Sequence, residues 1–408
     1  MRVRFGPEFF RDNRERLRSL FTGTAPIVIG AHGTLQQSAD SAYPFTQDKN
    51  FWYLTGLDIP DAVLVLDKLK EYIILPERPE WQVVFDGQTS EEAAQNLSGI
   101  QTIFSNKEGW RQLESRIKKV KHIASLLPAD PYVSHHGFYV NPARQNLMRR
   151  VSAINSAIQP LDLRAQLAAM RMIKQPAELD AIKEAIAVTG GTIKKLLRKD
   201  LTSFSSEFDI ETEIIRSFRK RSASTAFESI VAAGSSACTI HHLPTKQPLD
   251  VSGLILFDIG AAVDGYSADI SRTIPLGKIT KRMRQVYAAV IEVYDFALGH
   301  MRPGTVIKQY ENLVEEFMGE KLRELGLIQN IDHESVRKYY PHATSHHLGL
   351  DTHDSADYEK PLTENMVLTV EPGIYIPEEG IGIRVEDDIL ITAEGHKVLS
   401  PHLPRSLD

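Results

Sequence analysis

The sequence has almost no cysteine, no long apolar segment and no strong excess of either charge. Its single cysteine, Cys238, excludes an internal disulfide and is typical of a protein in a reducing compartment. No uncharged apolar run approaches the ~20 residues that a membrane-spanning helix needs. The net charge of −6, from 53 acidic and 47 basic residues, lacks the basic excess typical of nucleic-acid binding. We therefore expect a cytoplasmic protein with no membrane and no nucleic-acid partner.

The remaining composition is that of an ordinary globular protein. Hydrophobic residues make up 42% and charged residues 25% of the 408 positions, so the chain can bury a large core. This length suggests two or three domains. In the first part, short strand patterns alternate with helix patterns, which predicts an α/β domain with a mixed sheet and flanking helices. The predicted strands there include the aromatic run 51–54 and the run 83–85.

The pattern changes near residues 158–162, which we interpret as a linker. Beyond it, long helix patterns alternate with hairpin strand patterns, which argues for an α+β catalytic domain. The domain boundary is therefore predicted between a first domain, 1–160, and a second domain, 161–408.

One predicted hairpin in the second domain aims two carboxylates at the same place. Asp264-Gly265 is a dipeptide that favours a two-residue hairpin turn. With that turn, Asp258 and Asp269 share a face as diagonal neighbours, roughly 7–8 Å apart at the backbone. Two carboxylates in a strand core are costly unless a cation lies between them. A metal pair is one interpretation, and a hairpin with two solvated aspartates is the other.

Three further stretches carry side chains that bind hard metal ions. His346 lies in a histidine-rich loop that contains glycine, and Glu371 directly follows an apolar strand pattern. Glu386 shares one face of a predicted strand with Arg384. Four carboxylates balance two divalent cations, and one imidazole completes a set suited to Mn²⁺, Co²⁺, Zn²⁺ or Mg²⁺. Taken singly, each stretch is more typical of a solvated turn or an ordinary loop.

The order of these residues resembles that of the pita-bread metallopeptidases, which include aminopeptidase P, prolidase and methionine aminopeptidase. The family pattern is an Asp, a second Asp eleven residues later, a His in a glycine loop, a Glu before Pro-Gly and a Glu in an Arg-x-Glu-Asp strand. All of these positions are filled here. The resemblance implies a pita-bread catalytic domain whose metal ligands are Asp258, Asp269, His346, Glu371 and Glu386.

The resemblance also implies a role for each residue. Asp269 and Glu386 would bridge two divalent ions, Asp258 would bind one ion, and His346 with Glu371 would bind the other. Glu371 would also be catalytic and take a proton from the water that bridges the metals. Mn²⁺ is the expected ion, with Co²⁺ or Zn²⁺ as alternatives.

Residues around the ligands are assigned by the same resemblance. His241 and His353 would be catalytic, because they match histidines that bind the scissile carbonyl or nearby polar groups and stabilise the tetrahedral intermediate. The full substrate-binding set that the resemblance implies is His241, His342, His353, Tyr375 and Arg384.

The first domain decides between branches of the family. The stretch 38–56 looks like part of the N-terminal domain of aminopeptidase P. This resemblance implies an aminopeptidase that hydrolyses the N-terminal Xaa-Pro bond of peptides through a metal-bridging hydroxide, and that assembles as a homodimer or homotetramer. A prolidase, which cleaves Xaa-Pro dipeptides, is the alternative. A creatinase-like hydrolase and a catalytically silent pita-bread binding protein are further alternatives.

Overall fold

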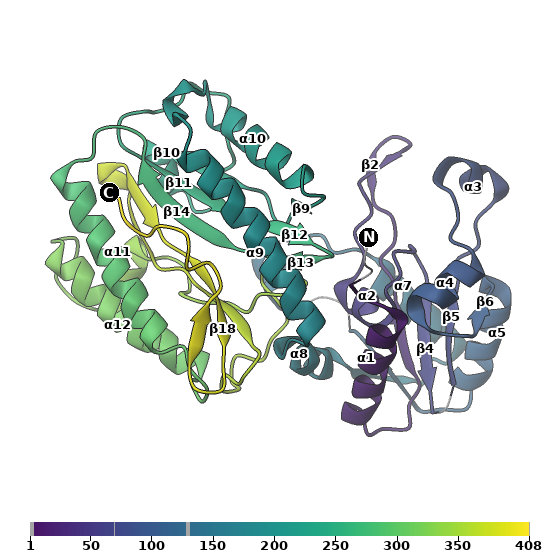
Figure 1. Ribbon diagram of the computed structural model, residues 1–408. Helices are drawn as coiled ribbons and strands as arrows, with labels where there is room; N and C mark the ends of the chain where they lie inside the picture. The colour runs from purple at the N-terminus through teal and green to yellow at the C-terminus, as the bar shows by residue number, and fades with distance from the viewer. Residues whose placement is uncertain (1–3, 69, 128–130, 408) are drawn as a thin grey trace. The chain divides into compact units, whose positions relative to one another are not determined.

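The computed structural model describes residues 4–68, 70–127 and 131–407 (Figure 1). The chain divides into two compact units, Met1–Met170 and Arg171–Asp408. The boundary expected between residues 160 and 161 stays a prediction about where the first domain ends. Across the described ranges, no helix has the length and apolar character to cross a membrane.

The first unit is built on a six-stranded sheet, and a short two-stranded hairpin stands apart from it. Its strands are β1 (Ile27–Gly30), β2 (Gln36–Ser38), β3 (Ser41–Ala42), β4 (Val63–Asp67), β5 (Lys70–Ile74), β6 (Ile103–Phe104), β7 (His122–Ser125) and β8 (Gln159–Asp162). The sheet order is β6-β5-β4-β1-β7-β8. The β1–β4 and β4–β5 pairs are antiparallel, whereas β5–β6, β1–β7 and β7–β8 are parallel. The sheet is therefore mixed, as predicted.

Two helices, Asn106–Ile117 (α5) and Ala143–Ile154 (α7), pack against this sheet and share with it an apolar core that includes Val28, Val65 and Leu113. The helices that begin in the first unit are α1 (Pro7–Leu20), α2 (Lys49–Thr55), α3 (Glu80–Asp86), α4 (Glu91–Ser98), α5 (Asn106–Ile117), α6 (Pro131–His136), α7 (Ala143–Ile154) and α8 (Arg164–Met172), and α8 continues past the end of that unit at residue 170. Two runs that were predicted as strands, 51–54 and 83–85, lie in helices α2 and α3 instead. The linker expected at 158–162 is also wrong, because residues 159–162 form the edge strand β8, parallel to β7.

Capping explains why the aromatic run 51–54 is helical. The carboxylate of Asp48 accepts hydrogen bonds from the amides of Asn50 and Phe51, at 2.9 Å each. Gly56 ends the helix with a positive φ of 67°. These two caps satisfy backbone groups at both ends of α2 and outweigh the preference of aromatic residues for strands.

Asp48 also gives the first unit a predictable pH dependence. Burial alone would raise the pKa of Asp48, but Arg144 and the Phe51 amide hold it below its ordinary value. The ionised form therefore stabilises the fold above about pH 4, and this stabilisation is lost as the pH falls through the lowered pKa. Asp48→Asn keeps the cap but loses the charge pair, so we expect it to cost about 2 kcal/mol at pH 7.

Urea unfolding followed by tryptophan fluorescence measures this effect in the first unit, because Trp52, Trp81 and Trp110 all lie there. The exposed Asp12 of α1 supplies the control Asp12→Asn, which changes the same charge without a buried partner. The loss in free energy of unfolding that Asp48→Asn causes should become smaller below pH 4. An equal loss of unfolding free energy at pH 7 and pH 3 would contradict the claim that ionised Asp48 stabilises the fold.

The second unit contains the long helices and hairpin strands that the sequence predicts. Its helices are α9 (Pro176–Leu197), α10 (Glu207–Arg219), α11 (Lys281–Gly299), α12 (Ile307–Glu324) and α13 (His333–Tyr339), with short 3₁₀ turns η1 (Leu201–Ser203), η2 (Gly234–Cys238) and η3 (Pro377–Glu379). Its strands are β9 (Ser224–Thr225), β10 (Ile230–Ala233), β11 (Leu254–Ile259), β12 (Ala261–Val263), β13 (Tyr266–Ser267), β14 (Ile270–Pro275), β15 (Val367–Val370), β16 (Gly373–Ile376), β17 (Ile381–Arg384), β18 (Asp387–Ile391) and β19 (His396–Val398). The α+β class is confirmed for this unit.

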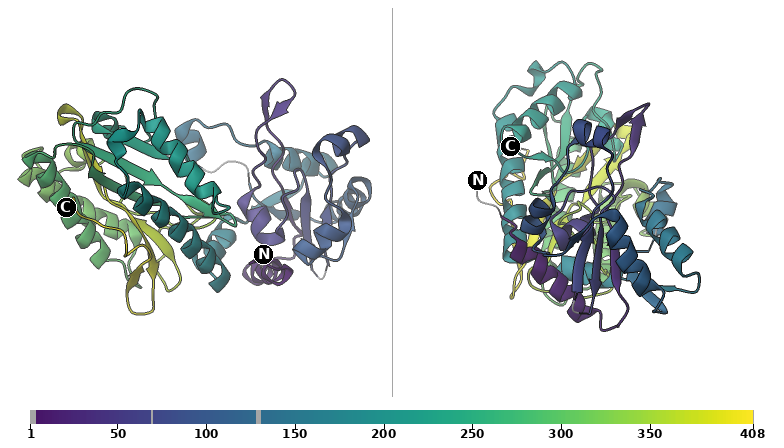
Figure 2. Two further views of the ribbon diagram at one scale, coloured as in Figure 1. Left: turned by 45° about the horizontal axis from the view of Figure 1, so that its top comes forward. Right: turned by 90° about the vertical axis from the view of Figure 1, so that its right-hand side faces the viewer.

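Small antiparallel sheets form the centre of the second unit, in the orders β10-β11-β14, β13-β12-β9, β15-β18-β19 and β16-β17. Helix α9 packs against β12 and β13, and α11 packs against β15, β16 and β17 (Figure 1). Helices α11 and α12 lie side by side, as Figure 1 and the left view of Figure 2 show. Their inner faces share an apolar core with β15 to β18, in which Val290, Val314 and Leu368 are fully buried. The strands that carry the predicted ligands are therefore held on a rigid support.

Candidate metal centre

The hairpin that carries the two aspartates has the predicted register. Asp264 and Gly265 form the turn with positive φ angles of 50° and 85°, as a two-residue turn of this dipeptide requires. Val263 pairs with Tyr266, and Asp258 pairs with Ser271, two residues beyond Asp269. Asp258 and Asp269 are therefore diagonal neighbours, as expected from the turn.

Gly260 allows the two halves of this hairpin to approach closely. A Cβ atom at position 260 would lie 2.0 Å from the carbonyl oxygen of Ala268 and 2.6 Å from the ring of Phe227. Any larger residue would push the backbone apart next to Asp269. The glycine thus helps to set the spacing of the aspartates.

The structure brings four of the predicted ligands together, three of them next to strand ends and His346 on a loop. Ligand atoms of Asp269, His346 and Glu386 all lie within 4.8 Å of one another. Nε2 of His346 is 3.5 Å from Oδ2 of Asp269 and 3.3 Å from Oε1 of Glu371. The fifth residue, Asp258, lies on β11 beside this group, and its charge raises the pKa values of Asp269, Glu371 and Glu386.

Unpaired oxygen atoms indicate that a cation belongs in this group. Within the described residues, Oδ1 of Asp258, Oδ1 of Asp269 and Oε1 of Glu386 are buried and have no hydrogen-bond partner. Burying such oxygens without a partner is costly, and native structures contain few of them. Here they lie on three of the five predicted ligands, so these residues fit divalent cations.

Proton affinities support the same conclusion. Burial, together with neighbouring carboxylates, raises the pKa of Asp269 and of Glu386 well above the ordinary values. Burial also raises the pKa of Glu371 to about 8, although the charge of Arg384 lowers it in part. Burial, and then the charge of His353, lowers the pKa of His346 to about 3, so its imidazole is neutral and can bind a metal at neutral pH. A cation at the centre would favour the ionised carboxylates.

Three of the predicted substrate-binding residues form one hydrogen-bonded chain that ends on Asp258. Nε2 of His342 and the hydroxyl of Tyr375 are 2.7 Å apart. The Arg384 guanidinium donates to that hydroxyl at 2.7 Å and also to Oδ2 of Asp258. Nε of Arg384 donates to Oγ of Ser271 at 2.9 Å. The Ser271 hydroxyl in turn donates to Oε2 of Glu386 at 2.6 Å. The chain therefore ties His342 and Tyr375 to the ligands Asp258 and Glu386.

The two remaining histidines lie further out. The ring of His353 stacks at an angle on the ring of His346, with 4.2 Å between centroids, and His353 is exposed. His241 is also exposed, in the loop after η2. In the described part of the chain His241 makes no hydrogen bond, ion pair or ring contact, but its charge contributes to the lowered pKa of His342.

Sequence reasoning missed two acidic residues around the centre. Oδ2 of Asp388 accepts a hydrogen bond from the amide of Asp269 at 3.2 Å, and Asp388 is fully buried. Taken singly, an acidic run such as 386–388 is more typical of a solvated turn, but Glu386, Asp387 and Asp388 are all buried. Glu311 of α12 accepts hydrogen bonds from the loop that carries His346. No spacing or motif in the sequence singles out Glu311 among the other glutamates of that helix.

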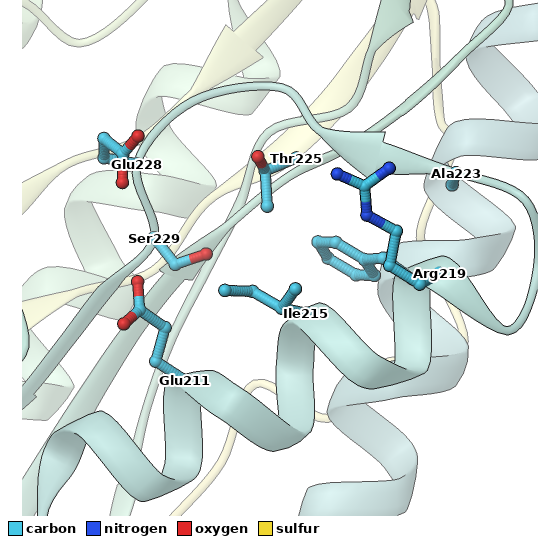
Figure 3. A pocket seen from close by; sticks show the side chains of 8 residues that line it. Glu211, Ile215, Arg219, Ala223, Thr225, Glu228 and Ser229 are labelled. Atoms are coloured by element: carbon cyan, nitrogen blue, oxygen red, sulfur yellow. The ribbon is translucent and has the colours of Figure 1, made fainter. Parts of the chain in front are cut away.

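A separate cavity of about 160 Å³ lies beside α10 and contains none of the predicted site residues. Glu211, Arg219 and Glu228 line it together with apolar side chains such as Ile215, as Figure 3 shows. The Ser229 side chain also lines this cavity. The carboxylate centre is therefore distinct from this cavity.

The fold and this oxygen-rich set of buried and partly buried ligands define a metal-dependent hydrolase. Comparison with known proteins gives the same class. Residues 180–393 match the metallopeptidase family M24, and residues 10–124 match the N-terminal domain of aminopeptidase P. The chain belongs to metallopeptidase family M24, and its second unit has the pita-bread fold.

Relatives match along nearly the whole chain. The Xaa-Pro aminopeptidase of Haemophilus influenzae is 32% identical over 98% of this chain and 95% of its own length. The Xaa-Pro aminopeptidase of Escherichia coli is 31% identical over 96% of this chain and 94% of its own. The solved structure of aminopeptidase P from E. coli with the inhibitor Pro-Leu has a TM-score of 0.83 at 28% identity, and covers 98% of this chain and 96% of that one. Both units therefore have counterparts in these proteins.

Proposed function

We propose that this chain is an aminopeptidase that uses two divalent metal ions to hydrolyse the N-terminal Xaa-Pro bond of peptides. The observation that carries the proposal is the close group of Asp269, His346 and Glu386 beside Glu371, with carboxylate oxygens that lack partners among the described residues. The names of the relatives supply the substrate class. An Xaa-Pro bond lacks the amide N–H and has a fixed φ, so it calls for a dedicated enzyme.

Each ligand would bind the ion or ions that the family resemblance assigns to it. Asp258 would hold one ion, His346 and Glu371 would hold the other, and Asp269 and Glu386 would contact both. The bound ions would supply a water of lowered pKa and a polarised carbonyl. We propose Mn²⁺ as the metal, with Co²⁺ or Zn²⁺ as alternatives that the same oxygen and imidazole ligands would accept.

The chain's own residues then move the protons. Burial raises the pKa of Glu371 to about 8 in the absence of metal. Its carboxylate would accept a proton from water and pass it to the departing proline nitrogen. The chain of His342, Tyr375 and Arg384 would hold the substrate against the ligands. The exposed His241 and His353 would bind the scissile carbonyl or nearby polar groups.

Further aspects of the protein follow as proposals. A single cysteine supports a cytoplasmic location, because reducing compartments do not favour disulfides. We also propose a homodimer or homotetramer and a domain boundary between residues 160 and 161, as the resemblance to aminopeptidase P suggests. Light scattering of the full chain measures the assembly directly.

A panel of peptides tests the proposed activity. The protein is stripped of metal with a chelator, reloaded with Mn²⁺ and assayed on Xaa-Pro-Xaa, Xaa-Ala-Xaa and Xaa-Pro peptides that share the same first residue. We expect release of the first residue from Xaa-Pro-Xaa, little release from Xaa-Ala-Xaa and no turnover in the stripped sample. Turnover of the Xaa-Pro dipeptide alone would replace the proposal with a prolidase, and turnover of none would refute it.

A further inference from the structure

A carboxylate on α12 accepts hydrogen bonds from the backbone of the loop that carries His346. Oε1 and Oε2 of Glu311 accept hydrogen bonds from the amide of Thr344 at 3.1 and 2.9 Å. Oε1 also accepts from the amide of Ser345 at 3.0 Å, and Oε2 accepts from Oγ1 of Thr344 at 3.1 Å. Thus one side chain accepts hydrogen bonds from both backbone amides and from one hydroxyl of the two residues that immediately precede His346.

The same loop is joined on its other side to the end of β15. The amide of Glu371 donates to the carbonyl oxygen of Thr344 at 2.9 Å. The amide of Thr369 donates to the carbonyl oxygen of His346, also at 2.9 Å. Oγ1 of Thr369 accepts from the amide of His346 at 3.1 Å. The loop therefore lies between Glu311 and β15, and its position sets the 3.3 Å separation of His346 Nε2 and Glu371 Oε1.

No other acceptor among the described residues takes the place of Glu311 at these two amides. The hydroxyl groups of Thr344 and Ser345 also contact the buried hydroxyls of Tyr340 and Tyr310, respectively. Both Thr344 and Ser345 are buried, so water cannot readily replace the carboxylate. A buried amide that loses its acceptor retains the full desolvation penalty.

We propose that Glu311 is a positioning residue that clamps the 344–346 loop and thereby holds His346 and Glu371 at the spacing needed to bind the second metal ion. The proposal rests on the proposed function, since it assigns the clamp to the ion that His346 and Glu371 would share. Glu311 itself binds no metal and contacts no substrate. It acts on the ligands through the backbone, as outer partners of metal ligands do in other proteins.

The variant Glu311→Gln tests the clamp, because an amide keeps the size of the side chain but turns one acceptor into a donor facing an N–H group. Glu316→Gln is the matched control, with the same substitution at an exposed position of the same helix. Mn²⁺ binding to the metal-free proteins is measured by calorimetry. We expect the weaker of the two Mn²⁺ affinities to fall by about tenfold in Glu311→Gln and to stay unchanged in the control.

Hydrogen exchange of the metal-free proteins separates a clamp from a general loss of stability. Amides 344–346 should exchange faster in Glu311→Gln, while those of β11 and β14 keep their protection. If Glu311→Gln does not fold, Glu311→Asp, which keeps the charge with a shorter reach, is expected to show both changes to a smaller extent. Unchanged affinity and exchange in a folded variant would overturn the clamp. Failure of the unmodified protein to bind Mn²⁺ or to cleave peptides would instead overturn the proposed function.

Discussion

Replacing Glu371 with glutamine is expected to lower kcat on an Xaa-Pro-Xaa peptide by about 10³-fold, because the residue that carries the proton can no longer accept it. The substitution keeps one oxygen that can bind metal, so much of the bound metal should remain. Burial raises the pKa of Glu371 to about 8, and the charges of Arg384 and Asp258 act on it in opposite directions. Steady-state kinetics and the metal content of the same sample together measure the effect.

Glu364→Gln is the matched control for this experiment. Glu364 is exposed and precedes β15, the strand that Glu371 follows. This control should keep the kcat of the unmodified protein. Glu371→Gln with unchanged kcat would remove Glu371 from the mechanism, whereas a loss of activity that only accompanies loss of metal would reduce its role to that of a ligand.

Asp269→Asn is expected to have the largest effect on metal binding. Asp269 would contact both ions, it lies within the cluster with His346 and Glu386, and its Oδ1 has no partner among the described residues. Asparagine removes one negative charge and one ligand oxygen, so we expect metal affinity to fall by more than about 100-fold, which exceeds the usual effect of losing an outer partner of a ligand. Turnover should fall below detection at Mn²⁺ concentrations that saturate the unmodified protein.

The turn of the same hairpin supplies the control. Asp264→Asn removes the same charge five residues away, and asparagine is equally suited to the positive φ of 50° at that position. This variant should bind metal and turn over substrate normally. Two ions bound with unchanged affinity in Asp269→Asn would exclude Asp269 as a bridging ligand.

Much of the centre could be predicted because hairpin geometry is local. The Asp264-Gly265 turn determines the pairing of Val263 with Tyr266, and a period of two then places Asp258 and Asp269 on one face. The meeting of His346, Glu371 and Glu386 with these aspartates is a tertiary event between distant strands. Only the order of the residues along the chain, through the resemblance to a family, anticipated it.

Features that depend on capping or on burial could not be predicted in this way. The run 51–54 has the residues of a strand, yet the hydrogen bonds that Asp48 accepts from Asn50 and Phe51 and a left-handed Gly56 make it helical. Asp388 looks like a solvated residue in sequence, because an acidic run gives no sign that the surrounding chain will bury it. Glu311 contacts residues more than thirty positions away, so its role follows only from the packing of α12.

Anomalous diffraction from crystals loaded with Mn²⁺ tests the central claim most directly. We expect two peaks about 3.5–4 Å apart, the usual spacing of a two-metal site. One should contact Asp258 and the other should contact His346 and Glu371, and Asp269 and Glu386 should contact both. A single peak, or two peaks that do not share Asp269, would contradict this assignment.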